Sequence, residues 1–335
     1  MPPTPAAPPL RRSLALVLLA ASSLAPAAPG QPPAPTSAPT AAPTSAPTSA
    51  EVLAAAAPAD WRPLDPESTL YVELPGGRVV VELAPAFAPR HVENVKKLAR
   101  AGYFDGLAVL RSQENYVVQW GDPRGGEEGA RAIAGAERAL SAELDRAIAD
   151  DLPFTPLPDG DVYAPEVGFS GGFPVARDAS SDGGTKRVWL AHCYAMVGAG
   201  RGDSADSGSG AELYVVIGHA PRHLDRNVTL LGRVVRGMEA LSTLPRGTGA
   251  LGFYEDPAEH VPVASIRVAA DLPEAARTPL ELLRTDTATF AAWVAARRHR
   301  REGWFLDPVG KIELCNVPLP VREPPPPEGA ETGSP

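Results

Sequence analysis

The stretch that decides the fold spans residues 76–123 and reads GGRVVVELAPAFAPRHVENVKKLARAGYFDGLAVLRSQENYVVQWGDP. Its first residues belong to a hairpin, because two β-branched, roughly alternating runs, Thr69–Leu74 and Arg78–Leu83, flank a Pro-Gly-Gly turn. After Pro89 the apolar side chains recur at helical spacing until Gly102, a residue suited to the position after a helix. The stretch therefore predicts a hairpin followed by one amphipathic helix.

Outward from this stretch, short strands dominate the chain. Further strands are predicted at 107–110, 116–119, 188–197, 213–217, 229–235 and 265–269, and a short helix at 237–244. Strands without alternating crossover helices favour an antiparallel barrel over a parallel α/β sheet. We therefore expect a mainly β fold, an antiparallel barrel of about eight strands capped by two helices.

The segments around this barrel differ from it in composition. We place the folded domain at 61–273, with an insertion at about 124–186 that is rich in Gly, Asp and Pro and contains a predicted short helix at 136–148. A C-terminal extension at 274–322 contains a helix with aromatic side chains on one face, which predicts packing against the barrel. The proline-rich tail, 323–335, is predicted to be disordered.

The N-terminal residues have the order of parts of a secretory signal peptide at 1–28. A basic pair, Arg11 and Arg12, precedes an apolar run at 14–24 and then small residues. That run is about half of the roughly 20 residues needed to span a bilayer, so a cleaved signal is favoured over an anchor. Residues 29–60 repeat Ala-Pro-Thr-Ser units and predict a disordered linker, because they have few large apolar side chains to bury. We expect a periplasmic or secreted protein without stable membrane insertion after cleavage.

The charge pattern argues against nucleic acid as a partner. The formal net charge is -9 at pH 7, and the basic residues are scattered apart from a cluster at 297–301. That cluster ends a predicted helix, where cations meet the negative end of the helix dipole. His219 and His223 have the spacing of a helical metal pair, but Pro221 between them argues against a helix. No metal site and no cofactor are predicted.

The two cysteines, Cys193 and Cys315, are too few for a disulfide scaffold. In an oxidising compartment they could form one bridge that ties the C-terminal segment to the barrel. The sequence leaves the paired and the unpaired state open.

The order of these sequence blocks resembles that of a known protein family. The stretch quoted above resembles the N-terminal half of cyclophilin-type peptidyl-prolyl cis-trans isomerases, and weaker blocks similar to the second half follow in the family's order. The matching blocks are Val79–Leu83, Ala88–Pro89 with Val92–Val95, Gly102–Gly106, Val109–Pro123, Tyr194–Gly198, Gly210–Val216 and 224–234. Several blocks in the right order at nearly the right spacing are far more specific than any single block. The resemblance covers about residues 67–271, without the insertion.

The resemblance implies an enzyme that isomerises X-Pro bonds of exported proteins during folding. Its partners would be proline-containing polypeptides, and it would work as a monomer without a cofactor. The alternative is a cyclophilin-like module that holds proline-containing segments as a chaperone or scaffold and turns them over weakly or not at all. Ala191–Cys193 and Asp206–Gly210 are similar to the histidine and serine blocks of trypsin-like proteases, but only about a dozen residues separate them, which disfavours a protease.

The resemblance also places the site. The family's catalytic arginine falls on Arg111. Its substrate-binding positions fall on Tyr116, Val117, Gln119, Glu212, Tyr214, His223 and Leu224. Aromatic and aliphatic walls with few polar groups are what a pyrrolidine ring requires.

Several residues depart from the family pattern at or near these positions. Tyr116 and Tyr214 replace the two pocket phenylalanines, and His223 replaces a tryptophan. Leu110 replaces a histidine, Trp120 replaces a glycine, and Glu212 replaces a glutamine. We expect Trp120 to crowd the groove and the Glu212 carboxylate to pair with Arg111 in competition with the substrate. Both effects would lower activity.

Overall fold

The structure is a computed structural model and describes residues 46–125, 128–150, 152–179 and 186–326. The predicted signal peptide, residues 29–45 of the predicted linker and residues 327–335 of the predicted tail lie outside the described residues. None of the helices in the described ranges combines the length and the apolar character that crossing a membrane requires.

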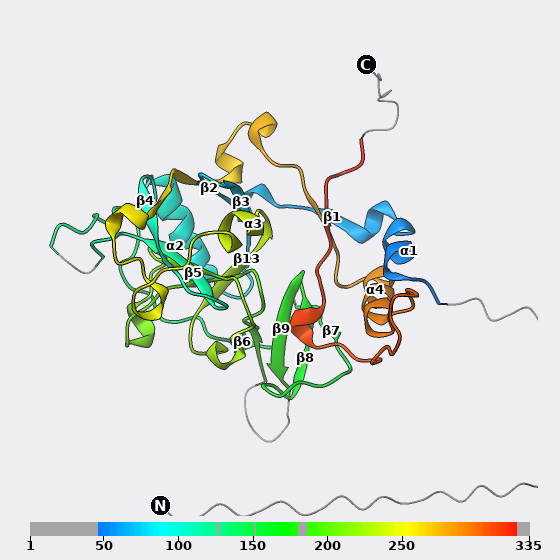
Figure 1. The fold of residues 1–335 in the computed structure, drawn as a ribbon. Helices are drawn as coiled ribbons and strands as arrows, with labels where there is room; N and C mark the ends of the chain where they lie inside the picture. The colour runs from blue at the N-terminus through cyan, green and yellow to red at the C-terminus, as the bar shows by residue number, and fades with distance from the viewer. Residues whose placement is uncertain (1–45, 126–127, 151, 180–185, 327–335) are drawn as a thin grey trace, which may run out of the picture. The chain divides into compact units, whose positions relative to one another are not determined.

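The main sheet has nine strands in the order β14-β4-β5-β12-β11-β13-β3-β2-β15, and every neighbouring pair is antiparallel. Of these strands, β2, β3, β4, β5 and β13 are labelled in Figure 1. The strands are β2 (Thr69–Leu74), β3 (Gly77–Leu83), β4 (Leu107–Ser112), β5 (Val117–Gly121), β11 (Met196–Ala199), β12 (Leu213–Val216), β13 (Leu230–Arg236), β14 (Val261–Val263) and β15 (Ser265–Val268). The two edge strands, β14 and β15, are consecutive in the chain and meet at Ala264, whose N–H donates to Glu73 O at 2.9 Å. The sheet therefore nearly closes, as predicted, and the ninth strand arises because the last strand bends at Ala264.

The barrel core follows from the alternation of side chains along its strands. On β5, Val118 and Trp120 point into the interior, whereas Val117 and Gln119 line the opposite, outer face. Trp120 is 0% exposed in the core, so the expectation that it crowds the groove is wrong: strand periodicity turns its indole away from the groove.

Two helices cap the barrel, as predicted. α2 (Pro89–Arg100) buries Val92, Val95 and Leu98 in the barrel core, and α3 (Met238–Ser242) buries Ala240 and Leu241 there. Gly102, with φ of 67°, follows the end of α2 in the left-handed conformation that glycine tolerates.

The insertion forms a second sheet rather than the predicted helix at 136–148. Five antiparallel strands lie in the order β6-β10-β9-β8-β7. They are β6 (Arg146–Ala147), β7 (Thr155–Pro156), β8 (Glu166–Ser170), β9 (Phe173–Asp178) and β10 (Arg187–Leu190). The strand predicted at 188–197 is thus two strands, β10 in this sheet and β11 in the barrel.

Contacts with α2 hold the segment around residue 140 in an irregular, non-helical conformation. Asn94 donates to Glu137 O at 2.9 Å and accepts from Glu137 N at 2.8 Å. Glu143 accepts from the backbone N–H of His91 at 2.9 Å and contacts its ring Nδ1 at 2.7 Å. These tertiary hydrogen bonds replace those of a local helix, which explains why the helical spacing of 136–148 predicted the wrong element.

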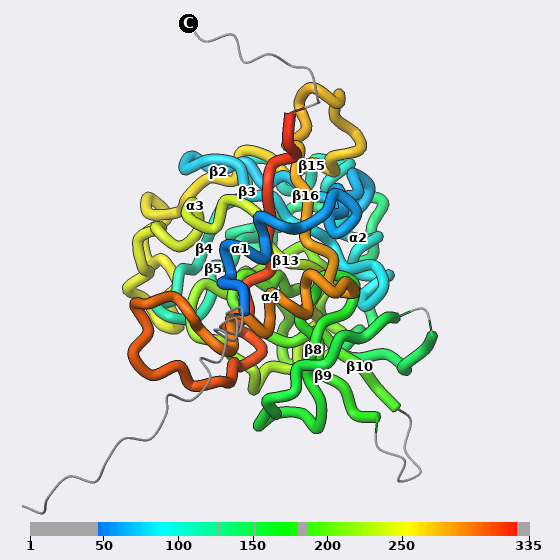
Figure 2. The backbone as a smooth tube through the Cα atoms, turned by 90° about the vertical axis from the view of Figure 1, so that its right-hand side faces the viewer, coloured from blue at the N-terminus to red at the C-terminus, as the bar shows by residue number. Residues whose placement is uncertain are grey.

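The predicted linker is also shorter than expected. Its end forms α1 (Ser49–Ala54), which begins at a capping box between Thr48 and Glu51 and contacts α4 (Ala288–Arg298) (Figure 2). Val52 is buried in the neighbouring core and Leu53 and Ala56 pack against it, so the cap and this apolar burial together order the segment.

The C-terminal extension is only partly helical. Besides α4 it contains β16 (Glu281–Leu283) and β17 (Val321–Arg322), which form a three-stranded sheet with β1 (Trp61–Pro63). Cys193 and Cys315 form a disulfide that ties this segment to the residues before β11. Short 3-10 turns lie at Pro58–Asp60, Pro66–Ser68, Ala205–Ser207, Arg222–Leu224, Ala250–Gly252, Pro257–Glu259, Ala269–Asp271, Glu274–Ala276 and Leu314–Asn316.

Candidate functional site

Arg111 stands at the end of β4 on the outer face of the barrel. A β-bulge between Val109 and Arg111 sets the register, so that Arg111 lies opposite Gln119 of β5. All three guanidinium nitrogens donate hydrogen bonds. Nε donates to Leu251 O at 2.7 Å, Nη1 to Gln119 Oε1 at 3.2 Å, and Nη2 to Gln113 Oε1. The guanidinium is thus fixed on one side by its own strands and on the other by a distant loop.

That loop, residues 250–253, approaches Arg111 closely. Leu251 adopts φ of 56°, which is uncommon for a residue with a side chain. A Cβ on Gly252 would lie 2.6 Å from Gln113 Cα, so only glycine fits there. The rings of Phe253 and Tyr116 lie 5.5 Å and 5.6 Å from the guanidinium carbon. These two aromatic rings lie within cation–π distance of the charge.

An open cavity of about 200 Å³ lies beside Arg111. It is lined by Arg111, Tyr116, Val117, Gln119, Gly200, Arg201, Tyr214, Leu224 and Val228. A cavity of this size is smaller than a typical cofactor site, which spans about 300–1,000 Å³, and it suits a single apolar ring. A Cβ on Gly198 would lie 2.3 Å from the Tyr214 ring, so Gly198 leaves the room in which this ring lies.

A buried network of hydrogen bonds supports Tyr214, one of the residues that line the cavity. The Tyr214 hydroxyl is 2.9 Å from His192 Nε2, and His192 Nδ1 is 3.0 Å from Asp225 Oδ1. Because the Asp225 carboxylate only accepts, Nδ1 carries the proton and Nε2 accepts from the hydroxyl. Arg222 Nε donates to the other Asp225 oxygen at 2.7 Å. His192 therefore supports the pocket wall, and its ring faces a tyrosine rather than the serine that a protease would need.

The charge states of the groups in this network follow from their burial and from their hydrogen-bond partners. Burial lowers the pKa of His192, against the opposing effect of Asp225, so the imidazole is neutral. Burial alone would raise the pKa of Asp225, but its bonds with His192 and the charge of Arg222 lower it overall. Burial raises the pKa of Tyr214, so its hydroxyl stays protonated and donates.

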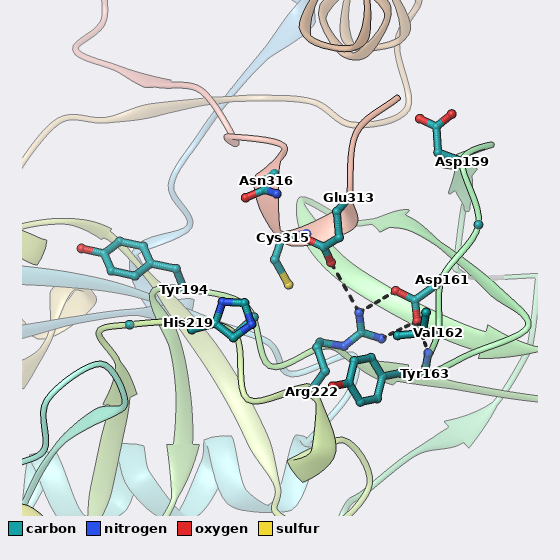
Figure 3. A pocket seen from close by; sticks show the side chains of 13 residues that line it. Asp159, Asp161, Val162, Tyr163, Tyr194, His219, Arg222, Glu313, Cys315 and Asn316 are labelled. Carbon is teal, nitrogen blue, oxygen red and sulfur yellow. Dashed lines mark hydrogen bonds and ion pairs between the residues drawn. The ribbon is translucent and has the colours of Figure 1, made fainter. Parts of the chain in front are cut away.

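Arg222, at the outer end of this hydrogen-bond network, lines a second cavity of about 500 Å³ (Figure 3). Its walls come from the insertion, from the turn at Arg222 and from the C-terminal segment around Cys315. Buried Arg222 donates to both oxygens of Asp161 at 2.9 Å and 3.2 Å and lies 3.8 Å from Glu313. The insertion and the extension thus brace the turn that carries Leu224 into the first cavity.

Glu212 does not form the expected pair with Arg111. Its Oε2 accepts from Gln119 Nε2 at 3.0 Å, while Gln119 Oε1 accepts from Arg111. The amide of Gln119 fills the space between the two charges, and Glu212 fixes its orientation because a carboxylate can only accept. Burial lowers the pKa of Arg111, but a guanidinium stays charged at neutral pH.

Six of the eight residues singled out from the sequence line the cavity together. Glu212 lies behind Gln119, and the ring of His223 stacks on Tyr116 with centroids 6.4 Å apart. Sequence reasoning missed the residues that contact these groups from elsewhere in the chain: Gln113, His192, Gly198, Arg201, Val228, Leu251 and Phe253. Leu251 lies 140 residues from Arg111, and no local signal connects the two.

Across residues 46–326, apart from the undescribed gaps, no three His, Cys, Asp or Glu side chains are placed to hold a metal ion. The polar side chains that line the first cavity are two arginines, Arg111 and Arg201, one amide, Gln119, and two tyrosines, Tyr116 and Tyr214, with no serine, cysteine or carboxylate among them. Such a set can polarise a carbonyl or an amide by hydrogen bonding, but it supplies no nucleophile.

Comparison with known proteins places the chain among relatives. The model of the family described as cyclophilin type peptidyl-prolyl cis-trans isomerase/CLD matches residues 69–268. A probable peptidyl-prolyl cis-trans isomerase of Brucella suis is 42% identical over 62 residues, which are 18% of this chain and 32% of that protein. Human peptidyl-prolyl cis-trans isomerase-like 1 is 32% identical over 103 residues, 31% of this chain and 56% of the relative. The matched part thus spans about a third to a half of these relatives.

A solved structure shares the fold. The cyclophilin AquaCyp293 from Hirschia baltica superposes with a TM-score of 0.61 at 24% identity, covering 78% of this chain and 92% of the other.

Proposed function

The chain belongs to the cyclophilin-type peptidyl-prolyl cis-trans isomerase family, and we propose that it isomerises X-Pro bonds in the cavity beside Arg111. One observation carries the proposal: a permanently charged guanidinium stands at the edge of a small apolar cavity. The apolar walls would hold the prolyl ring while the guanidinium acts on the bond that precedes it.

Rotation about an X-Pro bond is slow because resonance gives the C–N bond partial double-bond character, with a barrier of about 18–20 kcal/mol. A cation that donates a hydrogen bond near the prolyl amide weakens that resonance without any covalent step. A guanidinium has five N–H groups. In the described part of the chain, Leu251, Gln119 and Gln113 accept from three of them. Two N–H groups, one on each terminal nitrogen, remain for the substrate.

Gln119 acts as a positioning residue in this proposal. It holds Nη1 of Arg111 with its oxygen and is itself held by Glu212 through its nitrogen. The departure at Glu212 therefore supports the charged group rather than neutralising it, and catalysis is compatible with the acidic residue.

The test is exchange spectroscopy on a short X-Pro peptide, which detects catalysis too slow for coupled assays. We expect wild type to accelerate exchange and Arg111→Ala to lose about 10²–10³-fold, the effect of removing one preorganised donor. Arg111→Lys keeps the positive charge but lacks the several N–H donors of a planar guanidinium, so it should retain part of the activity if folding is intact. Arg236→Ala, an exposed arginine paired with Glu323, is the matched control and should behave as wild type.

Two results would contradict the proposal. If wild type leaves the exchange rate at its spontaneous value, the hypothesis that the protein is an isomerase fails. Peptide binding without acceleration would then favour the chaperone or scaffold module. If Arg111→Ala is as active as Arg236→Ala, the guanidinium is not the catalytic group.

The clients are, in this proposal, exported proteins met in the periplasm or outside the cell, and the working unit is a monomer. The signal-peptide pattern at 1–28 supports export. The Cys193–Cys315 disulfide supports it independently, because such bonds persist in oxidising compartments. Cell fractionation with N-terminal sequencing tests this; recovery of uncleaved protein from the cytosol would contradict it.

A further inference from the structure

The segment after α4 closes a loop of unusual composition, which we call the 299–310 loop. A Cβ on Gly310 would lie 3.6 Å from His299 Nδ1, so the two ends of the loop lie against each other. Surface loops of this length whose ends lie close together are frequently functional. In Figure 2 this dark orange segment forms a wide loop beside α4.

The loop displays apolar side chains to solvent. Trp304 is 83% exposed, Leu306 is 97% exposed and Val309 is 82% exposed. Among the described residues, only Val162 is a comparably exposed large apolar side chain elsewhere, at 93%. Single exposed apolar residues need no explanation, but three within six residues concentrate exposed apolar surface in one short segment, which is typical of interaction sites.

Basic residues flank this apolar segment in the sequence. The segment 297–311 carries five basic residues, Arg297, Arg298, Arg300, Arg301 and Lys311, against the acidic Glu302 and Asp307. Of these, Arg298 is held by Asp159 in an ion pair of 2.6 Å, whereas Arg301 and Lys311 are exposed. The Arg300 guanidinium lies 5.0 Å from the Phe305 ring, and the Phe305 and Trp304 rings lie 5.0 Å apart. Arg300 is therefore linked to Trp304 through the Phe305 ring, and the positive charge of this segment contrasts with the chain's net charge of -9.

We propose that the 299–310 loop is a membrane-surface contact that inserts Trp304, Leu306 and Val309 at the headgroup boundary of an anionic bilayer. Tryptophan is enriched at that boundary because its ring is apolar with one polar end. Arginine and lysine beside it interact with anionic headgroups while their stems cover apolar surface. The contact is peripheral and independent of the isomerase site.

The chain offers an internal reporter for this contact. Its other tryptophans, at 61, 120, 189 and 293, are buried, and residues 1–45 contain none. All five tryptophans emit, but only Trp304 is exposed, so a lipid-dependent change in the emission reports on the loop, even in the full chain with its apolar N-terminal run. Trp304→Phe should remove the lipid-dependent change in emission, which would confirm that this change comes from Trp304.

The experiment titrates the full chain with vesicles of phosphatidylglycerol and phosphatidylcholine in equal parts, and with pure phosphatidylcholine. We expect the anionic vesicles to shift Trp304 emission to the blue and to protect it from acrylamide. Neutral vesicles should bind at least about 20-fold more weakly, because each basic residue contributes about fivefold near an anionic surface.

Exposed positions allow clean variants. Leu306→Ser with Val309→Ser should weaken binding about tenfold or more, because each buried methylene adds to membrane affinity. Arg301→Gln with Lys311→Gln should weaken it about 20-fold and flatten its salt dependence. Val162→Ser, equally exposed but in the insertion, is the matched control and should bind as wild type.

Three outcomes would overturn the proposal. The first is an unchanged Trp304 emission with anionic vesicles at low salt. The second is equal binding by the Leu306/Val309 variant and by Val162→Ser. The third is a blue shift that rises with protein concentration without lipid, which would identify the loop as a contact between protein molecules.

Discussion

Replacing Tyr214 by phenylalanine should cost stability while leaving isomerisation intact. The change removes only the hydroxyl that donates to His192 Nε2 at 2.9 Å and keeps the ring that forms the pocket wall. His192 is completely buried, and its Nδ1 proton is committed to Asp225. A tautomer change therefore cannot rescue the lost bond.

The magnitude follows from leaving one buried acceptor without a partner, which costs about 1–3 kcal/mol. For a domain of this size about 2–4 °C of melting temperature corresponds to each kcal/mol, so the midpoint should fall by roughly 2–12 °C. Denaturant unfolding at pH 7 with the disulfide intact measures the free energy. Exchange spectroscopy on the same samples measures activity.

Tyr116→Phe is the matched control. Tyr116 lines the same cavity but is partly exposed, so water can replace its lost contacts and the free energy of unfolding should change by about 0.5 kcal/mol or less. Equal unfolding midpoints for the two variants would refute the role given to His192. Loss of catalysis in Tyr214→Phe with an intact fold would refute the separation of stability from activity.

Two further predictions concern the buried His192 and the Cys193–Cys315 disulfide. The lowered pKa of His192 means that the folded state binds a proton less readily than the unfolded state. The free energy of unfolding should therefore fall below pH 6.5, by at most about 1.4 kcal/mol per pH unit. His192→Gln should show a shallower slope between pH 7.5 and 5, and equal slopes would contradict this. The Cys193–Cys315 disulfide closes a loop of 122 residues, so a dithiol reductant should lower the free energy of unfolding by about 4–5 kcal/mol in the chain-entropy model. The double serine variant should not respond to the reductant, and an unchanged wild-type midpoint after reduction would count against the prediction.

The sequence by itself determined the hairpin of β2 and β3, helix α2 and the antiparallel character of the barrel. Each of these depends on local periodicity or on the spacing of turn residues, which neighbouring residues specify. The order of motifs also singled out Arg111 and most of its pocket, because strand alternation brings Val117, Gln119 and Tyr214 to one face.

Only the tertiary structure decided what these residues contact. Gln119 separates Arg111 from Glu212, His192 supports Tyr214, and Leu251 reaches Arg111 from 140 residues away. The segment at 136–148 follows α2 instead of its own helical spacing, and the residues before Trp61 order against α4. In each case the free energy comes from hydrogen bonds or burial between distant segments. A local pattern carries no record of such partners, because the fold alone brings them within a few ångströms of each other.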